Sequence, residues 1–169
     1  MKIHADEETT GTTEAPLMTC MAFHPTQEKD LALSKQLSSL PWIRQKQCWK
    51  NAVTTLLADH TQKNWHYVEG ACLDFSVLAS GFVFEHGWLT TPDMTIVDPT
   101  RPHHGIWYIP VKTYSWEDSF RCAITQSTSV PFVYAKGHEA DRRIYLSYFE
   151  LIWQELPRIK GRIQENVPC

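Results

Sequence analysis

Two short apolar segments on either side of Pro92 constrain the fold of this chain most strongly. Residues 82–90 and 94–98 are rich in β-branched and aromatic side chains, and the proline between them favours a reversal of the chain. The pattern predicts a β-hairpin centred on Pro92. In that register His86 lies directly opposite Asp98, with their Cβ atoms about 4.5–5.5 Å apart on one face of the sheet.

A helix is predicted earlier in the sequence than this hairpin. Apolar residues from Cys48 to Ala58 recur with helical spacing, so Cys48 is the first residue of the helix. The partial positive charge and free N–H groups of a helix N-terminus favour a thiolate there. A thiol in this position and an imidazole held by a carboxylate are the parts of an activated nucleophile. The pattern therefore indicates Cys48 as nucleophile, His86 as base and Asp98 as the orienting acid.

Two alternatives stay open for these residues. Cysteine is among the most frequently buried residue types, so Cys48 on the apolar stripe of a helix is also typical of a core. The hairpin register matters because a slip of one residue would place His86 and Asp98 on opposite faces. For an oxyanion, the backbone N–H of Cys48 is one donor, and we favour Gln47 over Gln45 as the second.

The remaining segments predict an α+β fold. We expect residues 1–20, which are polar and without periodicity, to be a flexible tail, and residues 21–169 to form one domain. Further strands are expected over residues 65–73, 106–114 and 131–135. Further helices are expected over residues 27–40, with Thr26 as N-cap, over 116–124, with Ser115 as cap, and over 147–156, with Ser147 and Glu150 as a capping box.

Composition argues against several functional classes. The net charge of −3 gives no electrostatic reason to expect nucleic acid as a partner. The five cysteines are widely spaced without a CxxC pair, which argues against a disulfide framework. The N-terminal residues lack an apolar signal-peptide core, and no apolar run approaches the roughly 18 residues of a membrane span. We therefore expect a cytoplasmic protein without a membrane partner.

A cluster of histidines raises the question of a metal site. His103 and His104 are adjacent, and adjacent residues on a strand point to opposite sides. The spacing of the other histidines and cysteines does not match a known zinc-ligand pattern. We interpret residues 101–105 as a solvated loop that could rim a cleft, and we expect neither a metal nor another cofactor.

Four short motifs resemble a pattern found in bacterial and phage proteins. The pattern reads CxxNA, YVEG, EHAW and VDPT, and the corresponding segments here are residues 48–52, 67–70, 85–88 and 97–100. Their order is similar to that of the transglutaminase-like and papain-like cysteine hydrolases, whose triad is Cys, His and Asp. The resemblance covers about residues 42–112. Gly87 stands where alanine is usual, and residues 105–110 replace a more compact Tyr-Gly-Ile-Pro run.

The resemblance implies a papain- or transglutaminase-like core, in which a helix bearing the cysteine packs on an antiparallel sheet bearing the histidine and the aspartate. It implies the roles already given to Cys48, His86 and Asp98. It also draws attention to Tyr67 and Glu69, which share one face of a strand and could bind substrate or support the site. Trp88 lies on the His86 face and is expected to wall a cleft or to belong to the core.

The expected function is that of a cysteine-dependent amide hydrolase or acyl transferase acting on a protein or peptide. Peptide cleavage, glutamine deamidation and transamidation share the same chemical steps, so the sequence does not separate them. The alternative is a non-catalytic binding module of the same fold, serving as a phage, plasmid or effector interaction protein. The sequence leaves the oligomeric state open.

Overall fold

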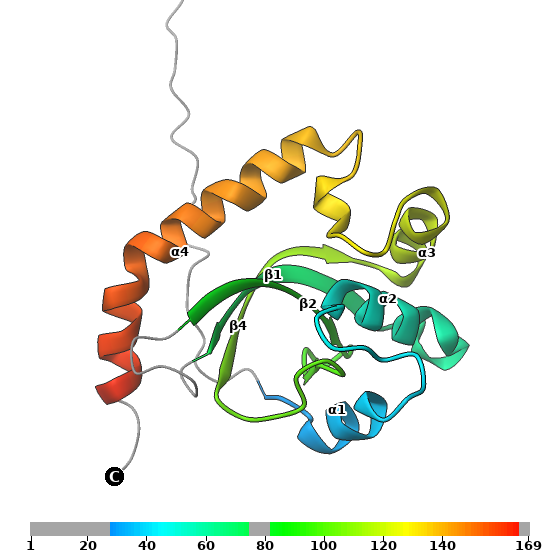
Figure 1. The fold of residues 1–169 in the computed structure, drawn as a ribbon, viewed down its shortest axis with the longest axis horizontal. Coiled ribbons are helices and arrows are strands. Elements are labelled where there is room, and N and C mark those ends of the chain that lie inside the picture. Colours follow the sequence, from blue (N-terminus) through cyan, green and yellow to red (C-terminus); the bar gives the residue numbers. More distant parts are fainter. Residues whose placement is uncertain (1–27, 75–81, 166–169) are drawn as a thin grey trace, which may run out of the picture.

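A four-stranded antiparallel sheet organises the fold, with strands in the order β3-β2-β1-β4. The structure is a computed structural model that describes residues 28–74 and 82–165, with side chains up to residue 158 in the last helix. The described part of the chain is α+β (Figure 1). Its strands are β1 (His66–Asp74), β2 (Phe82–Thr90), β3 (Ile96–Val97) and β4 (Ile106–Tyr114). Its helices are α1 (Leu31–Ser38), α2 (Cys48–Ala58), α3 (Trp116–Thr125) and α4 (Glu139–Glu165), with short 3-10 turns η1 (His60–Gln62) and η2 (Phe132–Tyr134).

The sheet depends on a close approach of two strands at Gly70. A Cβ on this residue would lie 2.1 Å from the carbonyl oxygen of Ile109 on β4, so only glycine fits there. The register between β1 and β4 shifts at this point, leaving Val111 without a partner in β1. Pro110 is tolerated next to this bulge because β4 is an edge strand.

Three groups of buried apolar side chains hold the elements together. The first joins α2 to the sheet and includes Ala52, Leu56, Tyr67 and Leu89. The second lies under α4, which arches along the outside of the sheet in Figure 1, and includes Leu73, Val83, Ile152 and Leu156. The third lies on the other face of β1 and β2 and includes Val68, Cys72, Trp88 and Tyr108. His86 projects into this third group, which explains its burial.

Several predicted elements are confirmed. The helix at Cys48–Ala58, the strand at 82–90 and the strand at 106–114 have the predicted bounds. Strand β1 is shifted by one residue from the predicted 65–73. Helix α3 begins where predicted, because the Ser115 side chain accepts a hydrogen bond from the Asp118 N–H.

The first predicted helix is too long. Helix α1 begins at Leu31, and its N-cap is Asp30, whose side chain accepts from the Leu33 N–H at 2.8 Å. The residues before it are extended and run parallel to β3, with the Ile96 N–H donating to the Glu28 carbonyl at 2.8 Å. The predicted cap Thr26 and the predicted tail 1–20 lie outside the described residues.

The strand predicted at 131–135 is wrong, because this segment forms the 3-10 turn η2. The N–H groups of Phe132 and Val133 donate to the buried carboxylate of Glu69 instead of to a neighbouring strand. A carboxylate 63 residues away in the sequence therefore decides the local structure.

The helix start predicted at Ser147 is also wrong. Helix α4 begins at Glu139, and the Ser147 hydroxyl donates to the Ile144 carbonyl within the helix. Tyr145 and Ile152 lie seven positions apart and are both buried, so one apolar stripe continues through the predicted boundary. Among the described residues, no helix combines the length and apolar character needed to cross a membrane.

The hairpin turn is centred one residue later than predicted. The Thr91 carbonyl accepts from the Met94 N–H at 2.9 Å, and Met94 takes the left-handed conformation with φ of 66°. Pro92 is therefore the second residue of the turn, a position that proline favours. Strand β2 pairs with β3 through Leu89 opposite Val97, so the predicted direct pairing of His86 with Asp98 is wrong by two residues. A slip of two residues keeps every side chain on its face, whereas a slip of one would not.

Candidate active site

Cys48 is the first residue of α2. Gln47 before it makes no side-chain hydrogen bond to cap the helix, and Lys46 takes a left-handed conformation with φ of 62°. The first N–H groups of a helix have no acceptor within the helix, so they are available to a ligand. The Cys48 side chain is nearly buried, with 7% of its surface exposed.

His86 lies on β2 with its ring enclosed by the sheet. Its Nε2 atom lies 2.8 Å from Oδ2 of Asp98, and both side chains are buried. The ring packs between Phe84, at a centroid distance of 5.6 Å, and Trp88, at 6.3 Å. Neighbours on both sides therefore fix the orientation of the imidazole.

Asp98 directly follows β3, and its carboxylate accepts four hydrogen bonds. Oδ2 faces His86 and also accepts from the Tyr108 hydroxyl at 2.7 Å. Oδ1 accepts from the backbone N–H groups of Thr100, at 2.9 Å, and Arg101, at 3.1 Å. The carboxylate is thus fixed in position as well as buried, as an orienting group requires.

The charges of this pair follow from their surroundings. Burial lowers the pKa of His86, but the charge and hydrogen bond of Asp98 and a side-chain hydrogen bond with Cys48 raise it to about 9. Burial raises the pKa of Asp98, but the lowering by His86, Lys29 and Tyr108 is larger, so the pKa lies well below its ordinary value. At neutral pH the pair is therefore an imidazolium and a carboxylate. Because Asp98 occupies Nε2, the Nδ1 atom of His86 is the one available to Cys48.

Asn51 is a site residue that the sequence analysis did not single out. Its Oδ1 accepts from the Arg44 N–H at 3.0 Å, and its Nδ2 donates to the Arg44 carbonyl at 2.6 Å. The same Nδ2 lies 3.0 Å from the Thr100 hydroxyl. Asn51 thereby ties the turn before Cys48 to the segment that follows Asp98. Its place one helical turn after Cys48, in the CxxNA motif, was the signal that could have identified it.

Glu69 supports the fold instead of lining a surface. The fully buried carboxylate accepts from the hydroxyls of Tyr67, at 2.8 Å, and Tyr114, at 3.3 Å. It also accepts from the N–H groups of Phe132 and Val133, at 2.5 and 3.1 Å. Burial raises the pKa of Glu69 to about 6, although these hydrogen bonds oppose the rise. The structure therefore favours the supporting role over substrate binding for both Tyr67 and Glu69.

Trp88 and Gly87 are also placed in the interior. Trp88 is 1% exposed and packs edge-on against Tyr108 at 5.1 Å, so it belongs to the core behind His86. A Cβ on Gly87 would lie 2.8 Å from Cδ1 of Trp49 and 3.1 Å from the Tyr67 ring. The glycine at a position where the resembling pattern has alanine thus makes room for Trp49.

The two candidate oxyanion donors lie on the surface, within three residues of Cys48 in the sequence. Gln45 and Gln47 are both exposed, and neither side chain hydrogen-bonds to another described residue. His103 and His104 are exposed in the loop before β4. Within the described ranges, no group of three His, Cys, Asp or Glu side chains is arranged to hold a metal ion.

The site therefore brings together Cys48, His86 and Asp98 and places Gln47 beside them, whereas Tyr67, Glu69 and Trp88 are packed into the interior. A comparison with protein-family models, curated proteins and solved structures found no match to this chain.

Proposed function

We propose that this protein is a cysteine-dependent amide hydrolase or acyl transferase acting on a protein or peptide. Cys48 is the nucleophile, His86 the acid–base group and Asp98 its orienting partner. The observation that carries the proposal is the His86 ring, which Asp98 holds at 2.8 Å and whose pKa is raised in part by Cys48, a cysteine at the start of a helix. These are the relationships that an activated thiol requires.

The reaction uses the protonated His86 that Asp98 holds in place. The Cys48 thiolate attacks the carbonyl carbon of an amide, forming a C–S bond and placing negative charge on the carbonyl oxygen. His86 then gives its Nδ1 proton to the leaving amine as the C–N bond breaks, which leaves a thioester on Cys48. Water then attacks the thioester and gives a proton to the now neutral His86, and the C–S bond breaks to release a carboxylic acid and restore the Cys48 thiolate. An amine that attacks in place of water gives up its proton in the same way and completes an acyl transfer. The Cys48 N–H and the Gln47 side chain serve as donors to the oxyanion.

The arrangement of the elements supports a papain- or transglutaminase-like core. A helix that begins with the cysteine packs on an antiparallel sheet, the histidine lies on β2, and the aspartate follows β3. This is also the order of the triad in the families that the sequence motifs resemble. The sheet and helix therefore hold the three side chains from separate parts of the chain, as a preorganised site requires.

The limited exposure of Cys48 determines which substrate should be used to test its reactivity. Only 7% of the Cys48 side chain is exposed, and the neighbouring exposed residues are Gln45, Lys46 and Gln47. We propose that substrate approaches from this side. A small activated ester, p-nitrophenyl acetate, is therefore the first probe to use. Attack by Cys48 releases p-nitrophenolate and leaves an acetyl group on the sulfur.

Cys122 provides a matched control for this experiment. It is a free cysteine with 9% exposure, close to that of Cys48, and burial raises its pKa. Peptide mapping by mass spectrometry separates all five cysteines of the chain. We expect acetyl groups on Cys48 at a rate at least tenfold above that of Cys122, and we expect His86→Ala to abolish this difference. Equal rates in the wild-type protein would contradict the proposal.

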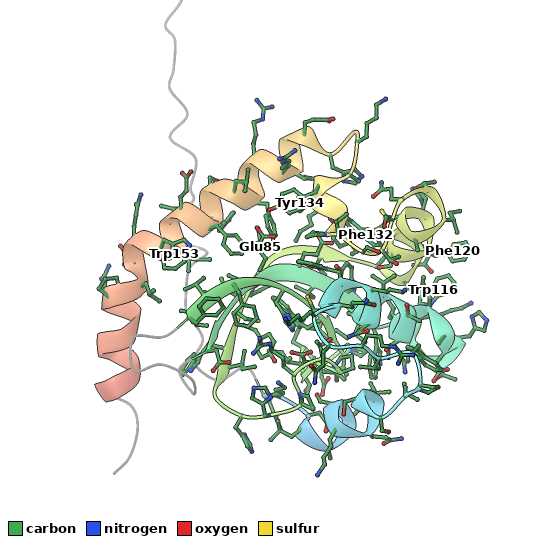
Figure 2. All side chains as sticks on the ribbon, viewed as in Figure 1. Glu85, Trp116, Phe120, Phe132, Tyr134 and Trp153 are labelled. Carbon is green, nitrogen blue, oxygen red and sulfur yellow. The ribbon has the colours of Figure 1, made fainter. Side chains whose placement is uncertain are left out.

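The competing function is a non-catalytic binding module. The observation that favours it is a pair of exposed apolar side chains on α3: Phe120 is 46% exposed and stacks at 5.4 Å on the half-buried Trp116, and Ile124 is 68% exposed. Figure 2 shows Trp116 and Phe120 at the α3 end of the molecule, away from Trp153 on α4. If Cys48 is acetylated no faster than Cys122, this function is the better account of the chain. If Cys48 reacts, the mass of a treated protein substrate separates deamidation from cleavage.

A further inference from the structure

The orienting acid has a second partner that the triad does not include. The Tyr108 hydroxyl donates 2.7 Å to Oδ2 of Asp98, the same oxygen that faces His86. Tyr108 is buried on β4, and its ring lies 6.3 Å from the His86 ring. The hydrogen bonds from Tyr108 and His86 therefore share one carboxylate oxygen, and each reduces the negative charge available to the other.

Lys29 in turn holds the Tyr108 hydroxyl. Its ammonium donates 2.6 Å to that hydroxyl, 2.6 Å to the Arg101 carbonyl and 3.2 Å to the His103 carbonyl. An ammonium has three donors, so all three are used. The same group lies 4.9 Å from the centre of the Tyr108 ring.

The backbone around Lys29 fixes this side chain in place. Residues 28–30 pair with Ile96 of β3, two positions before Asp98, through the bonds from the Ile96 N–H to the Glu28 carbonyl and from the Asp30 N–H to the Ile96 carbonyl. Lys29 therefore reaches Tyr108 from a segment that is itself attached to the strand preceding the orienting acid.

We propose, on the basis of the proposed function, that Tyr108 and Lys29 are positioning residues that keep Asp98 aligned on His86 and share its negative charge. Neither residue touches the reacting atoms. Tyr108 acts through Asp98, and Lys29 acts through Tyr108 and through its charge.

The sign of the effect follows from the shared oxygen. A donor or a cation at Asp98 stabilises the carboxylate and so weakens its attraction for the His86 proton. Without the Tyr108 hydroxyl, Asp98 holds that proton more strongly, and His86 stays protonated to higher pH. Cys48 on α2 contributes to the raised pKa of His86, and Cys72 and Arg101 are further titratable groups near Asp98. The tests below leave these three residues unchanged.

Tyr114 is a matched control on the same strand. Its hydroxyl also donates to a buried carboxylate, that of Glu69, at 3.3 Å, and its exposure of 4% is close to the 7% of Tyr108. Tyr114→Phe therefore removes a comparable hydroxyl from the core without touching the triad.

The test measures the protonation of His86 and the pH profile of Cys48 acetylation separately. The imidazole proton of His86 is identified in NMR spectra as the signal absent from His86→Gln. We expect Tyr108→Phe to move the His86 midpoint up by about 0.5–1 pH unit, the shift that corresponds to losing one hydrogen bond. The alkaline limb of the acetylation profile should move with it. Lys29→Met should shift the His86 midpoint and the alkaline limb upward as well, and Lys29→Arg should restore both to their wild-type values. Tyr114→Phe should change neither the midpoint nor the limb.

An unchanged His86 midpoint in Tyr108→Phe and Lys29→Met would overturn the inference, because a purely structural role predicts lower stability alone. Lys29→Met removes no aromatic core atoms, so it decides the question if Tyr108→Phe does not fold. Failure of the proposed function is a different result: Cys48 would then not be acetylated in the wild-type protein, while the NMR titration would still report on Tyr108 and Lys29.

Discussion

Asn51 on α2 donates a hydrogen bond to the hydroxyl of Thr100, two residues beyond Asp98, at 3.0 Å. The same Thr100 donates its backbone N–H to Oδ1 of Asp98 at 2.9 Å. Helix α2, which begins with Cys48, and the segment after Asp98 are thus connected through partly buried hydrogen bonds. We expect the relative position of Cys48 and Asp98 to depend on this connection.

Replacing Asn51 should therefore damage both stability and reactivity. Asn51→Ala leaves the N–H and carbonyl of Arg44 without their side-chain partner, and each of these partly buried hydrogen bonds costs about 1–3 kcal/mol when lost. Because two such bonds are lost, we expect urea unfolding to show a loss of about 2 kcal/mol or more, and we expect Cys48 acetylation to slow at least tenfold. Asn64→Ala, at an exposed position, is the control and should change neither. Acetylation at the wild-type rate in Asn51→Ala would contradict the connection.

The ion pair of His86 and Asp98 should make stability depend on pH in the alkaline range. Burial lowers the pKa of His86, but Asp98 and Cys48 raise it to about 9, above the 6.5 of an unfolded chain. The stabilisation is fully present below pH 6.5 and is lost as the pH rises through 9. We expect the free energy of unfolding, measured in urea at intervals from pH 6 to 9.5, to fall by up to a few kcal/mol. His86→Gln should remove this slope; a slope that persists in the variant would assign it to another group.

Glu69 should have a separate effect at acid pH. Burial raises its pKa from 4.5 to about 6, so its contribution to stability is fully present below 4.5 and is lost as the pH rises through 6. Glu69→Gln, which carries no charge, should flatten the dependence between these values in the same unfolding experiment. The variant also loses acceptors for Phe132 and Val133, so its stability at pH 4.5 should be lower by about 1–3 kcal/mol. An unchanged dependence would show that Glu69 does not titrate in this range.

Gly87→Ala tests the room made for Trp49. The new methyl group would lie 2.8 Å from Cδ1 of Trp49, the residue after Cys48, and overpacking of this kind typically costs about 1–3 kcal/mol. Thermal unfolding should show the loss. Gly87→Ala combined with Trp49→Leu should recover part of it, because leucine leaves space for the methyl group. Equal stability of Gly87→Ala and the wild-type protein would show that Trp49 moves freely.

The helix at Cys48 and the strands β2 and β4 could be predicted because local patterns decide them. Helical spacing fixes the ends of α2, and the aromatic and β-branched residues fix the strands. The hairpin register could not be fixed, since a proline indicates a turn but not how many residues the turn contains, and the left-handed residue proved to be Met94. The prediction that His86 and Asp98 lie on the same face of the sheet was nevertheless correct, because the register was wrong by an even number of residues.

The contacts over long sequence distances explain the remaining errors. The η2 turn depends on Glu69, and the position of Asp98 depends on Tyr108 and Lys29, which no local pattern connects to it. From the sequence, Glu69 could either bind substrate or support the site. The four hydrogen bonds that its carboxylate accepts in the structure favour the supporting role. Polar networks between distant residues carry no periodic signal in a sequence, so they require a structure.

The pairing of residues 28–30 with β3 has a further consequence, for association between chains. An uncovered edge strand offers its backbone to another molecule, which favours aggregation. At Ile96 both backbone groups are already bonded, to Glu28 and Asp30. On the opposite edge, Pro110 provides no N–H and the bulge at Val111 interrupts the ladder. At these points the two edges of the sheet are poor templates for the addition of a further strand.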